Sequence, residues 1–394
     1  MKKLIILAIC LTFLSGCSFI LNGSMDYSTP HASEPNKDAH PMFVEVTSYQ
    51  ELCQALLSFV ASHEDAGIVR FSAYNGDMEN DLTKACSFVT NDSALGSYSV
   101  SYIGSSLNRI VSYYEATVNI IYKRSAAEIA GIITADNADK IQDVIRNMLN
   151  TCKQKAAISI GDESINQDTF AKALDRAYYS EPDLIVAMPE MEITQYSDAN
   201  GKGRIYEVTM TYPEPSDVML SKRDSLETAI EQISLRLTGI EDSASRLYQL
   251  CLYLAENVTL HDDVSDEEYS RSDSINTAYG ALYDRAASSE GYAMTMKLLC
   301  DWFKFDWADF ECIVVSGRYN NYIHYWNMMK IDGKWYHFDI TRLNDDPYDA
   351  LMSDDDSMES AYSWDTSAYP ACNGELDYTF LTESGNSVED DEQE

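Results

Sequence analysis

The chain has 394 residues, enough for two or three domains of ordinary size. Hydrophobic residues make up 45% of it and aromatic residues 11%, which is too much apolar material for a disordered chain. Its 64 acidic residues against 28 basic ones give a formal charge of -36, which would repel a phosphate backbone. Composition and charge therefore argue against a single small module, a disordered protein and a nucleic-acid-binding protein.

The N-terminus has the pattern of an export signal. Residues 1–16 read MKKLIILAICLTFLSG, in which two lysines precede an apolar run from Leu4 to Leu14. This predicts a signal peptide, because the run is too short to span a bilayer. The run ends in LSGC at 14–17, which resembles the lipobox of bacterial lipoproteins and implies that Cys17 carries a lipid. An ordinary cleaved signal with an incidental cysteine is the alternative.

The expected mature chain is strongly acidic and begins with a tether. Without Lys2 and Lys3, 26 basic residues stand against 64 acidic ones, a net charge of -38. Such a chain is expected to stay off anionic lipid, so the lipid on Cys17 is its predicted link to the extracytoplasmic face of a bacterial membrane. Residues 17–43 are rich in Ser, Asn, Pro and Asp after the first few, which predicts a flexible tether.

Two stretches of the chain show the same predicted order of elements, helix, strand, helix, strand, strand. In residues 44–125 these elements are 49–61, 67–73, 77–89, 97–103 and 113–122. In residues 136–214 they are 140–153, 156–161, 166–179, 184–187 and 204–212. The final strands also correspond, YYEATVNIIYK against GRIYEVTMTY. The sequence therefore predicts two tandem copies of a small αβαββ module.

The two modules contain no recognisable chemistry. Their one histidine, His63, lies near a helix end, where a solvated or capping role is favoured over a ligand role. We therefore expect the modules to be accessory units that recognise a protein or peptide of the cell envelope.

Residues 220–382 are predicted to form a C-terminal domain. Two helices come first, at 220–237 and 243–257. The acidic segment 261–274 lacks the ligand spacing and glycine of an EF-hand loop, so a solvated loop is favoured over a calcium site. Residues 383–394 are predicted to form a solvated acidic tail.

The cysteines show neither a disulfide framework nor a metal-binding spacing. Apart from Cys10 and Cys17 they are Cys53, Cys86, Cys152, Cys251, Cys300, Cys312 and Cys372. Their number is odd, they include no C-x-x-C pair, and most lie in apolar patterns. Buried free thiols are predicted.

A helix is predicted to start near Ser289. Its apolar positions recur at helical spacing at Tyr292, Met296, Leu299 and Phe303. Ser289 would lie at the helix N-terminus, which favours an anion and suits a thiolate better than a hydroxyl. Cys300 lies eleven residues further on, about 16 Å along a helix, and is too far away to take the place of Ser289.

A hairpin brings a histidine and an aspartate together. The Asp332–Gly333 pair predicts a two-residue turn, which sets Ile331 opposite Lys334. In this register His324 and Asp339 are diagonal neighbours on one face, about 7–8 Å apart at the backbone. A shift of one residue would put them on opposite faces.

Five motifs in this part of the chain carry a resemblance to a known family. In chain order they are AYGAL, SSEGYA, VVSG, HYWN and KIDGKWYHFDIT, within residues 240–382. Their order resembles the transglutaminase-like core, a papain-type cysteine fold with a helical part and an antiparallel sheet. The resemblance implies His324 as general base and Asp339 as its orienting partner. Trp326 is a candidate for lining the cleft, with cross-strand packing as the more usual role of an aromatic residue in a hairpin. At the position of the nucleophilic cysteine the chain has Ser289.

The predicted fold class is therefore α+β, with the papain-like core preceded by the tandem modules. A thiol can be held as a thiolate beside an imidazolium, whereas a hydroxyl cannot. We expect a catalytically inactive binding or scaffold protein. The alternative is a serine acyl hydrolase or transferase acting on peptide or protein amides or esters through Ser289, His324 and Asp339. Neither reading requires a metal or an organic cofactor.

Overall fold

The computed structural model of the chain describes residues 42–261 and 273–383. These residues form a mixed α+β fold with four sheets, as the sequence predicts at this level. The predicted signal peptide, Cys17, nearly all of the tether, most of the acidic segment 261–274 and most of the acidic tail lie outside the described residues. Within the two described ranges no helix combines the length and apolar character needed to cross a membrane.

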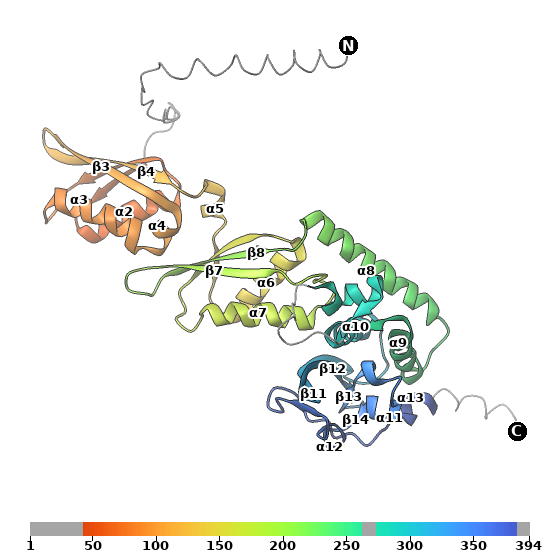
Figure 1. Cartoon of the computed structure of the whole chain (residues 1–394). Helices are drawn as coiled ribbons and strands as arrows, with labels where there is room; N and C mark the ends of the chain where they lie inside the picture. Colours follow the sequence, from red (N-terminus) through yellow and green to blue (C-terminus); the bar gives the residue numbers. More distant parts are fainter. Residues whose placement is uncertain (1–41, 262–272, 384–394) are drawn as a thin grey trace, which may run out of the picture.

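Residues 42–122, called here the first sheet unit, form a four-stranded sheet with helices on one face (Figure 1). Its strands are β1 (Met42–Val46), β2 (Ala66–Phe71), β3 (Val100–Ile110) and β4 (Tyr113–Tyr122), and its helices are α2 (Tyr49–Ala61), α3 (Met78–Ser87) and α4 (Ala94–Ser99). The strand order is β1-β2-β4-β3. The pair β1–β2 is parallel and the other pairs are antiparallel.

Local sequence explains where these elements begin. Helix α2 has the predicted bounds because Ser48 caps it, its hydroxyl accepting a hydrogen bond from the Glu51 amide. The predicted stripe at Leu52, Leu56 and Phe59 is buried, so this face of α2 forms the core of the unit.

Two predictions in the first sheet unit need correction. The sheet begins at Met42, so the last residues of the predicted tether belong to β1. The strand predicted at 97–103 begins only at Val100, because residues 97–99 complete helix α4. Ser93 caps this helix by accepting a hydrogen bond from the Gly96 amide, a local signal that the strand-like pattern concealed.

Residues 126–211, called the second sheet unit, repeat this topology. Its strands are β5 (Ile133–Ala135), β6 (Lys155–Ile160), β7 (Glu190–Ser197) and β8 (Arg204–Thr211), and its helices are α5 (Ala126–Ala130), α6 (Ala138–Thr151) and α7 (Gln167–Ser180). The order β5-β6-β8-β7 has the same senses of pairing as the first sheet. The short β5 pairs only with Ile158–Ile160, the second half of β6.

The strand predicted at 184–187 is wrong, because this stretch is a loop and the third strand of the unit is β7. Its apolar residues are buried by tertiary contacts instead of by a sheet. Val186 packs with Met219 and Tyr279, and its carbonyl accepts a hydrogen bond from Thr277. A short apolar run cannot distinguish these two forms of burial.

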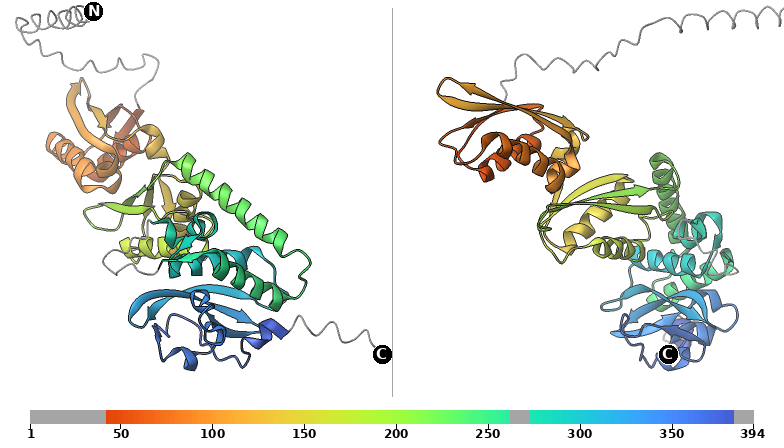
Figure 2. Two further views of the ribbon diagram at one scale, coloured as in Figure 1. Left: turned by 45° about the vertical axis from the view of Figure 1, so that its right-hand side comes forward. Right: turned by 60° about the vertical axis from the view of Figure 1, so that its left-hand side comes forward.

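The first sheet unit packs on the second through helix α4. Ala94 and Tyr98 of this helix contact Ala157 and Ile205 on the face of the second sheet. The Ala94 amide also donates a hydrogen bond of 2.7 Å to the Asp198 carboxylate. The two units follow one another in a row and lead into the C-terminal part (Figure 2).

The C-terminal part, residues 216–383, begins with helices and ends in a sheet. Its helices are α8 (Ser216–Arg236), α9 (Ser243–Asn257), α10 (Ser289–Trp302), α11 (Pro347–Ala350), α12 (Asp355–Met358) and α13 (Thr379–Glu383). Its strands are the paired β9 (Thr259–Leu260) and β10 (Ala286–Ala287), then β11 (Glu311–Tyr319), β12 (Tyr322–Ile331), β13 (Lys334–Phe338), β14 (Leu351–Ser353) and β15 (Tyr362–Trp364). The last five form an antiparallel sheet in the order β14-β13-β12-β11-β15.

The register of the β12–β13 hairpin is the predicted one. Ile331 pairs with Lys334, and the same register continues to Asn327 opposite Phe338. Asp332 and Gly333 both have positive φ, 47° and 78°, as a type I′ turn requires. The turn residues therefore fix which side chains of the hairpin share a face.

Helix α10 belongs to two cores at once. Its residues Tyr292, Met296 and Leu299 pack with the helices of the C-terminal part. Ala293 and Met294, on another face, join the apolar core of the second sheet unit. The helix that begins at Ser289 is therefore fixed from both sides.

Candidate functional site

Ser289 is the first residue of helix α10, where the sequence places it. Ser288 caps the helix by accepting a hydrogen bond from the Gly291 amide, and its hydroxyl donates to Asn276 Oδ1 at 2.6 Å. A Cβ atom on Gly291 would overlap the Ile275 carbonyl oxygen, so this first turn can approach its neighbours only with glycine there. Ser289 is 4% exposed.

His324 and Asp339 form a buried hydrogen-bonded pair. The His324 Nε2 atom lies 2.7 Å from Asp339 Oδ2, and the two residues are 4% and 1% exposed. His324 lies on β12 and Asp339 directly follows β13, so the hairpin register alone brings them together.

Two further residues hold the Asp339 carboxylate. Oδ1 accepts hydrogen bonds from the amide and the hydroxyl of Thr341, at 3.1 and 2.6 Å. Oδ2 accepts one from the Tyr362 hydroxyl at 2.7 Å. Burial raises the pKa of Asp339, but the attraction of His324 and these hydrogen bonds outweigh it and hold that pKa below its ordinary value. The carboxylate is therefore ionised near neutral pH.

The ionised carboxylate fixes the tautomer of the imidazole. Because an ionised carboxylate only accepts hydrogen bonds, His324 Nε2 carries the ring proton and donates a hydrogen bond to Asp339. In the neutral ring the lone pair then lies on Nδ1, which makes that atom the proton acceptor.

Helix α10 and strand β12 are joined next to this pair. The side-chain amide of Asn327 donates a hydrogen bond of 2.9 Å to the Ala293 carbonyl. Ser289 precedes Ala293 by one helical turn, and His324 precedes Asn327 by three residues on the strand. The structure thus pairs His324 with Asp339 and attaches the Ser289 helix to the strand that carries His324.

Aromatic rings surround His324, and one of them corrects a prediction. The rings of Tyr319, Tyr362 and Trp326 have centroids 5.6, 6.0 and 6.2 Å from the imidazole. Trp326 is 1% exposed and packs with Val315 in the interior, so it does not line an open cleft as the sequence suggests. Its position on a central strand, covered on this face by β15 and the segments beside it, explains the burial.

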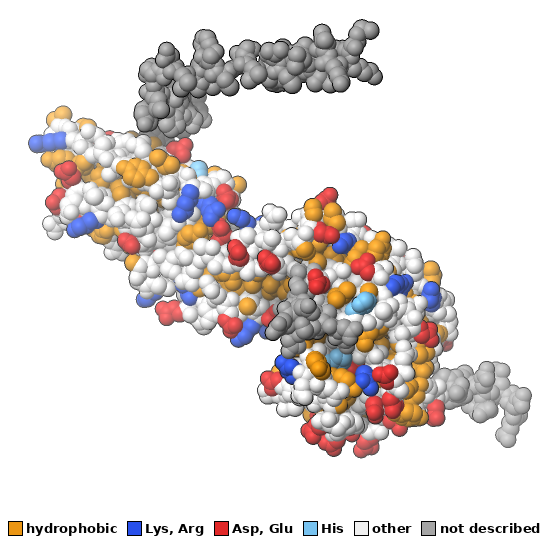
Figure 3. All heavy atoms as spheres, viewed as in Figure 1, with side chains coloured by type: hydrophobic (Ala, Val, Ile, Leu, Met, Phe, Trp, Pro, Cys, Tyr) orange, Lys and Arg blue, Asp and Glu red, His pale blue; other side chains and the backbone are white. Residues whose placement is uncertain are grey.

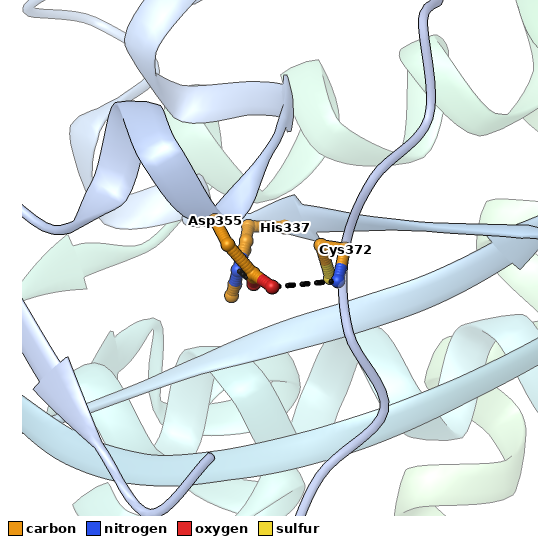
Figure 4. Close-up of side chains that lie close together, drawn as sticks. All are labelled: His337, Asp355 and Cys372. Carbon is orange, nitrogen blue, oxygen red and sulfur yellow. Dashed lines mark hydrogen bonds and ion pairs between the residues drawn. The ribbon is translucent and has the colours of Figure 1, made fainter.

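A second polar cluster lies in the interior under β13 and consists of His337, Asp355 and Cys372 (Figure 4). His337 Nε2 lies 2.9 Å from Asp355 Oδ1, and the Cys372 amide donates to the other oxygen of Asp355 at 3.1 Å. Their candidate ligand atoms lie within 4.8 Å of one another.

The hydrogen bonds of this cluster do not fit a metal site. The indole N–H of Trp326 can only donate, and it donates to His337 Nδ1 at 2.9 Å. The ring proton of neutral His337 is therefore on Nε2, where a metal ion would need the lone pair. The cluster is better described as a clamp that ties β13 to α12 and to the segment around Cys372.

Replacing His337 by alanine is expected to lower the free energy of unfolding by about 2–4 kcal/mol. The change removes two buried hydrogen bonds and leaves the Trp326 indole N–H without a partner. Urea denaturation measures the loss, and Cys372→Ser, which keeps the backbone bond to Asp355, is the matched control with a smaller effect. A rise of the wild-type melting temperature on adding zinc, absent in His337→Ala, would show instead that the cluster binds metal.

No other described thiol takes the place of the missing nucleophile. All seven described cysteines are free and buried, as the sequence predicts. Cys300, at the far end of α10, has a pKa raised by burial and by the neighbouring Cys312 thiol. A buried neutral thiol is a poor nucleophile.

Sequence reasoning missed Thr341, Tyr362 and the role of His337. His337, a residue of strand β13, is the centre of the clamp. The ring of His63 stacks on Tyr122, and its Nε2 lies 3.1 Å from the Arg124 carbonyl oxygen.

The sequence of this chain matches no known family and no curated protein.

Proposed function

We propose that residues 220–382 form a transglutaminase-like domain in which Ser289 occupies the nucleophile position, and that the domain binds a protein or peptide without cleaving it. The observation that supports this most is the placement of a serine, 4% exposed, at the first residue of α10. A helix N-terminus stabilises an anion, but a serine hydroxyl stays neutral near pH 7. The N-terminus of α10 is thus arranged as for a cysteine thiolate, but the residue at this position is a serine.

The His324–Asp339 pair is compatible with the same proposal. The two residues are 4% and 1% exposed and are joined by a hydrogen bond of 2.7 Å. A buried hydrogen bond of this kind stabilises the fold whether or not the site performs chemistry.

A serine acyl hydrolase or transferase is the second candidate, and the tautomer of His324 favours it. With Nδ1 as acceptor, His324 would take the Ser289 proton while Oγ bonds to an amide or ester carbonyl carbon. The proton would pass to the leaving amine or alcohol as the C–N or C–O bond breaks, and water or another nucleophile would then release the acyl group.

We propose further that the protein is a lipoprotein held by Cys17 at the extracytoplasmic face of a bacterial membrane, with residues 17–41 as most of its tether. The two sheet units would be tandem copies of one accessory module that recognises an envelope protein or peptide. Their identical strand order and senses of pairing support the duplication.

Labelling with a fluorophosphonate separates the two functions. The mature chain is treated with the probe beside Ser289→Ala, and labelled protein is measured by in-gel fluorescence. We expect equal, background labelling of both, since an unactivated serine does not react. Labelling of the wild type that Ser289→Ala abolishes would replace the binding role with the hydrolase.

A further inference from the structure

A small hollow lies between the first and second sheet units, away from Ser289. It has a volume of about 260 Å³, somewhat below the roughly 300–1,000 Å³ usual for small-molecule sites. Its lining residues are of three kinds. Four are small (Ala127, Gly131, Ala156 and Ala157), four are charged (Glu128, Lys153, Lys155 and Glu207), and one is aromatic (Tyr98). A ligand of one or two amino acid residues has a suitable size.

The charge of the hollow is opposite to that of the chain. Basic side chains gather where the two sheet units meet (Figure 3), and Lys153 and Lys155 line the hollow. The Arg124 guanidinium is already paired with Glu207 at 2.5 Å and with Glu128 at 3.7 Å. Arg124 offsets one of the two carboxylates, so with Lys153 and Lys155 the hollow keeps a net charge of about +1.

Neither lysine has a close partner. Lys155 Nζ is 4.0 Å from Glu207, at the limit of an ion pair, and its side chain is 59% exposed. Lys153 has no side-chain hydrogen bond or ion pair with any described residue. The unpaired Lys153, beside the weakly paired Lys155, favours an anionic ligand.

Tyr98 offers a hydrogen-bond donor to the hollow. Its side chain lines the hollow, and no described residue makes a hydrogen bond with its hydroxyl. The Arg124 guanidinium lies 4.9 Å from the ring centroid, which holds the ring in place. The hydroxyl is not among the buried polar atoms without a partner, so it faces solvent in the hollow and can donate to an oxygen of a ligand.

The edge of the second sheet provides room for a peptide backbone. In the first sheet, β1 pairs with Gly67–Phe71 of β2. In the second sheet, β5 pairs only with Ile158–Ile160, so Lys155–Ala157 of β6 stay at a free edge that lines the hollow. A free strand edge binds extended peptides through main-chain hydrogen bonds.

From these features we infer that the hollow binds the C-terminal carboxylate of an extended peptide with small side chains. The carboxylate lies between Lys153 and Lys155 and accepts a hydrogen bond from Tyr98. The last residues of the peptide follow the free edge of β6 above the alanine and glycine floor. This site does not depend on Ser289 or on the function proposed for the C-terminal part.

Calorimetric titration of the mature chain with N-acetyl-alanyl-alanine tests the inference, beside the same dipeptide as its C-terminal amide. The free acid is expected to bind at least about tenfold more tightly than the amide, because only the acid offers the charge. Lys153→Met and Lys155→Met should each weaken binding of the acid about tenfold, and Tyr98→Phe severalfold. Lys140→Met, a change at an exposed lysine of α6 outside the hollow, is the matched control.

Several outcomes would overturn the inference. Equal affinity for acid and amide, no detectable binding of either, or binding that the lysine variants leave unchanged would each contradict a carboxylate site. Acetate and inorganic phosphate are titrated as well. If either binds as tightly as the dipeptide acid, the site is a general anion site and the peptide assignment is wrong.

Discussion

Replacing Ser289 by cysteine is expected to give the protein one fast-reacting thiol. A cysteine here would lie at the N-terminus of α10, on the helix that Asn327 ties to the strand of His324. Both the helix terminus and an imidazolium lower the pKa of a thiol. An ordinary thiol, with a pKa near 8.5, is about 3% ionised at pH 7, so full ionisation would speed alkylation about 30-fold.

The other described cysteines should add little background to this alkylation experiment. All seven described cysteines are buried, and burial raises the pKa of six of them, Cys53, Cys86, Cys152, Cys251, Cys300 and Cys372. Iodoacetamide should therefore label these described thiols of the wild type slowly. The rate of alkylation of Ser289→Cys at pH 7, measured by intact mass, is compared with that of a model thiol.

The control removes the base. In Ser289→Cys/His324→Ala the alkylation rate should fall back toward that of an ordinary thiol, because the imidazolium partner is gone. A cysteine at 289 that reacts no faster than the model thiol, or that is indifferent to His324, would show that position 289 is not part of a His324 site. Hydrolysis of an activated ester that appears only in Ser289→Cys would indicate an intact cleft lacking its nucleophile.

The parts of the fold that sequence predicted well depend on local signals. The Asp332–Gly333 turn is sufficient to set the hairpin register, and the register places His324 beside Asp339. The serine cap and the helical spacing of apolar residues likewise set the start of α10 at Ser289. Each of these signals lies within a few residues of the feature that it determines.

What sequence could not predict depends on distant contacts. Tyr362 reaches Asp339 only because β15 pairs with β11 at the sheet edge, and no local pattern encodes that pairing. The loop at 184–187 has the composition of a strand, but its apolar side chains are buried against Met219 and Tyr279. Tyr179 donates a hydrogen bond to the buried Glu290 from another unit, which is also invisible in either segment alone.

Removing the Asp339 carboxylate is expected to lower the stability of the C-terminal part strongly. Asp339→Ala leaves the Tyr362 and Thr341 hydroxyls and His324 Nε2 without their acceptor in the interior. Loss of one partner of a buried charged pair costs about 3–5 kcal/mol. Domains are stable by only about 5–15 kcal/mol, so this variant should unfold at a much lower urea concentration.

Two milder variants keep the experiment informative if Asp339→Ala does not fold. Tyr362→Phe and Thr341→Val each remove one side-chain hydrogen bond to the carboxylate and should cost about 1 kcal/mol. An Asp339→Ala variant as stable as the wild type would show that the pair contributes nothing to the fold. The presence of the His324–Asp339 pair would then point to a role in binding or chemistry.

The pH dependence of stability gives a separate measure of the same carboxylate. The pKa of Asp339 in the folded chain lies below its ordinary value, so the unfolded chain binds the proton more readily. Its stabilising contribution is therefore complete above about pH 5 and is lost as the pH falls through the ordinary aspartate pKa, about 3.9, toward the lower folded value. In Asp339→Asn, which does not titrate, this part of the acid loss should be absent. The difference in unfolding free energy between wild type and Asp339→Asn should thus shrink as the pH falls below about 5, and a difference that grows in acid would contradict an ionised Asp339.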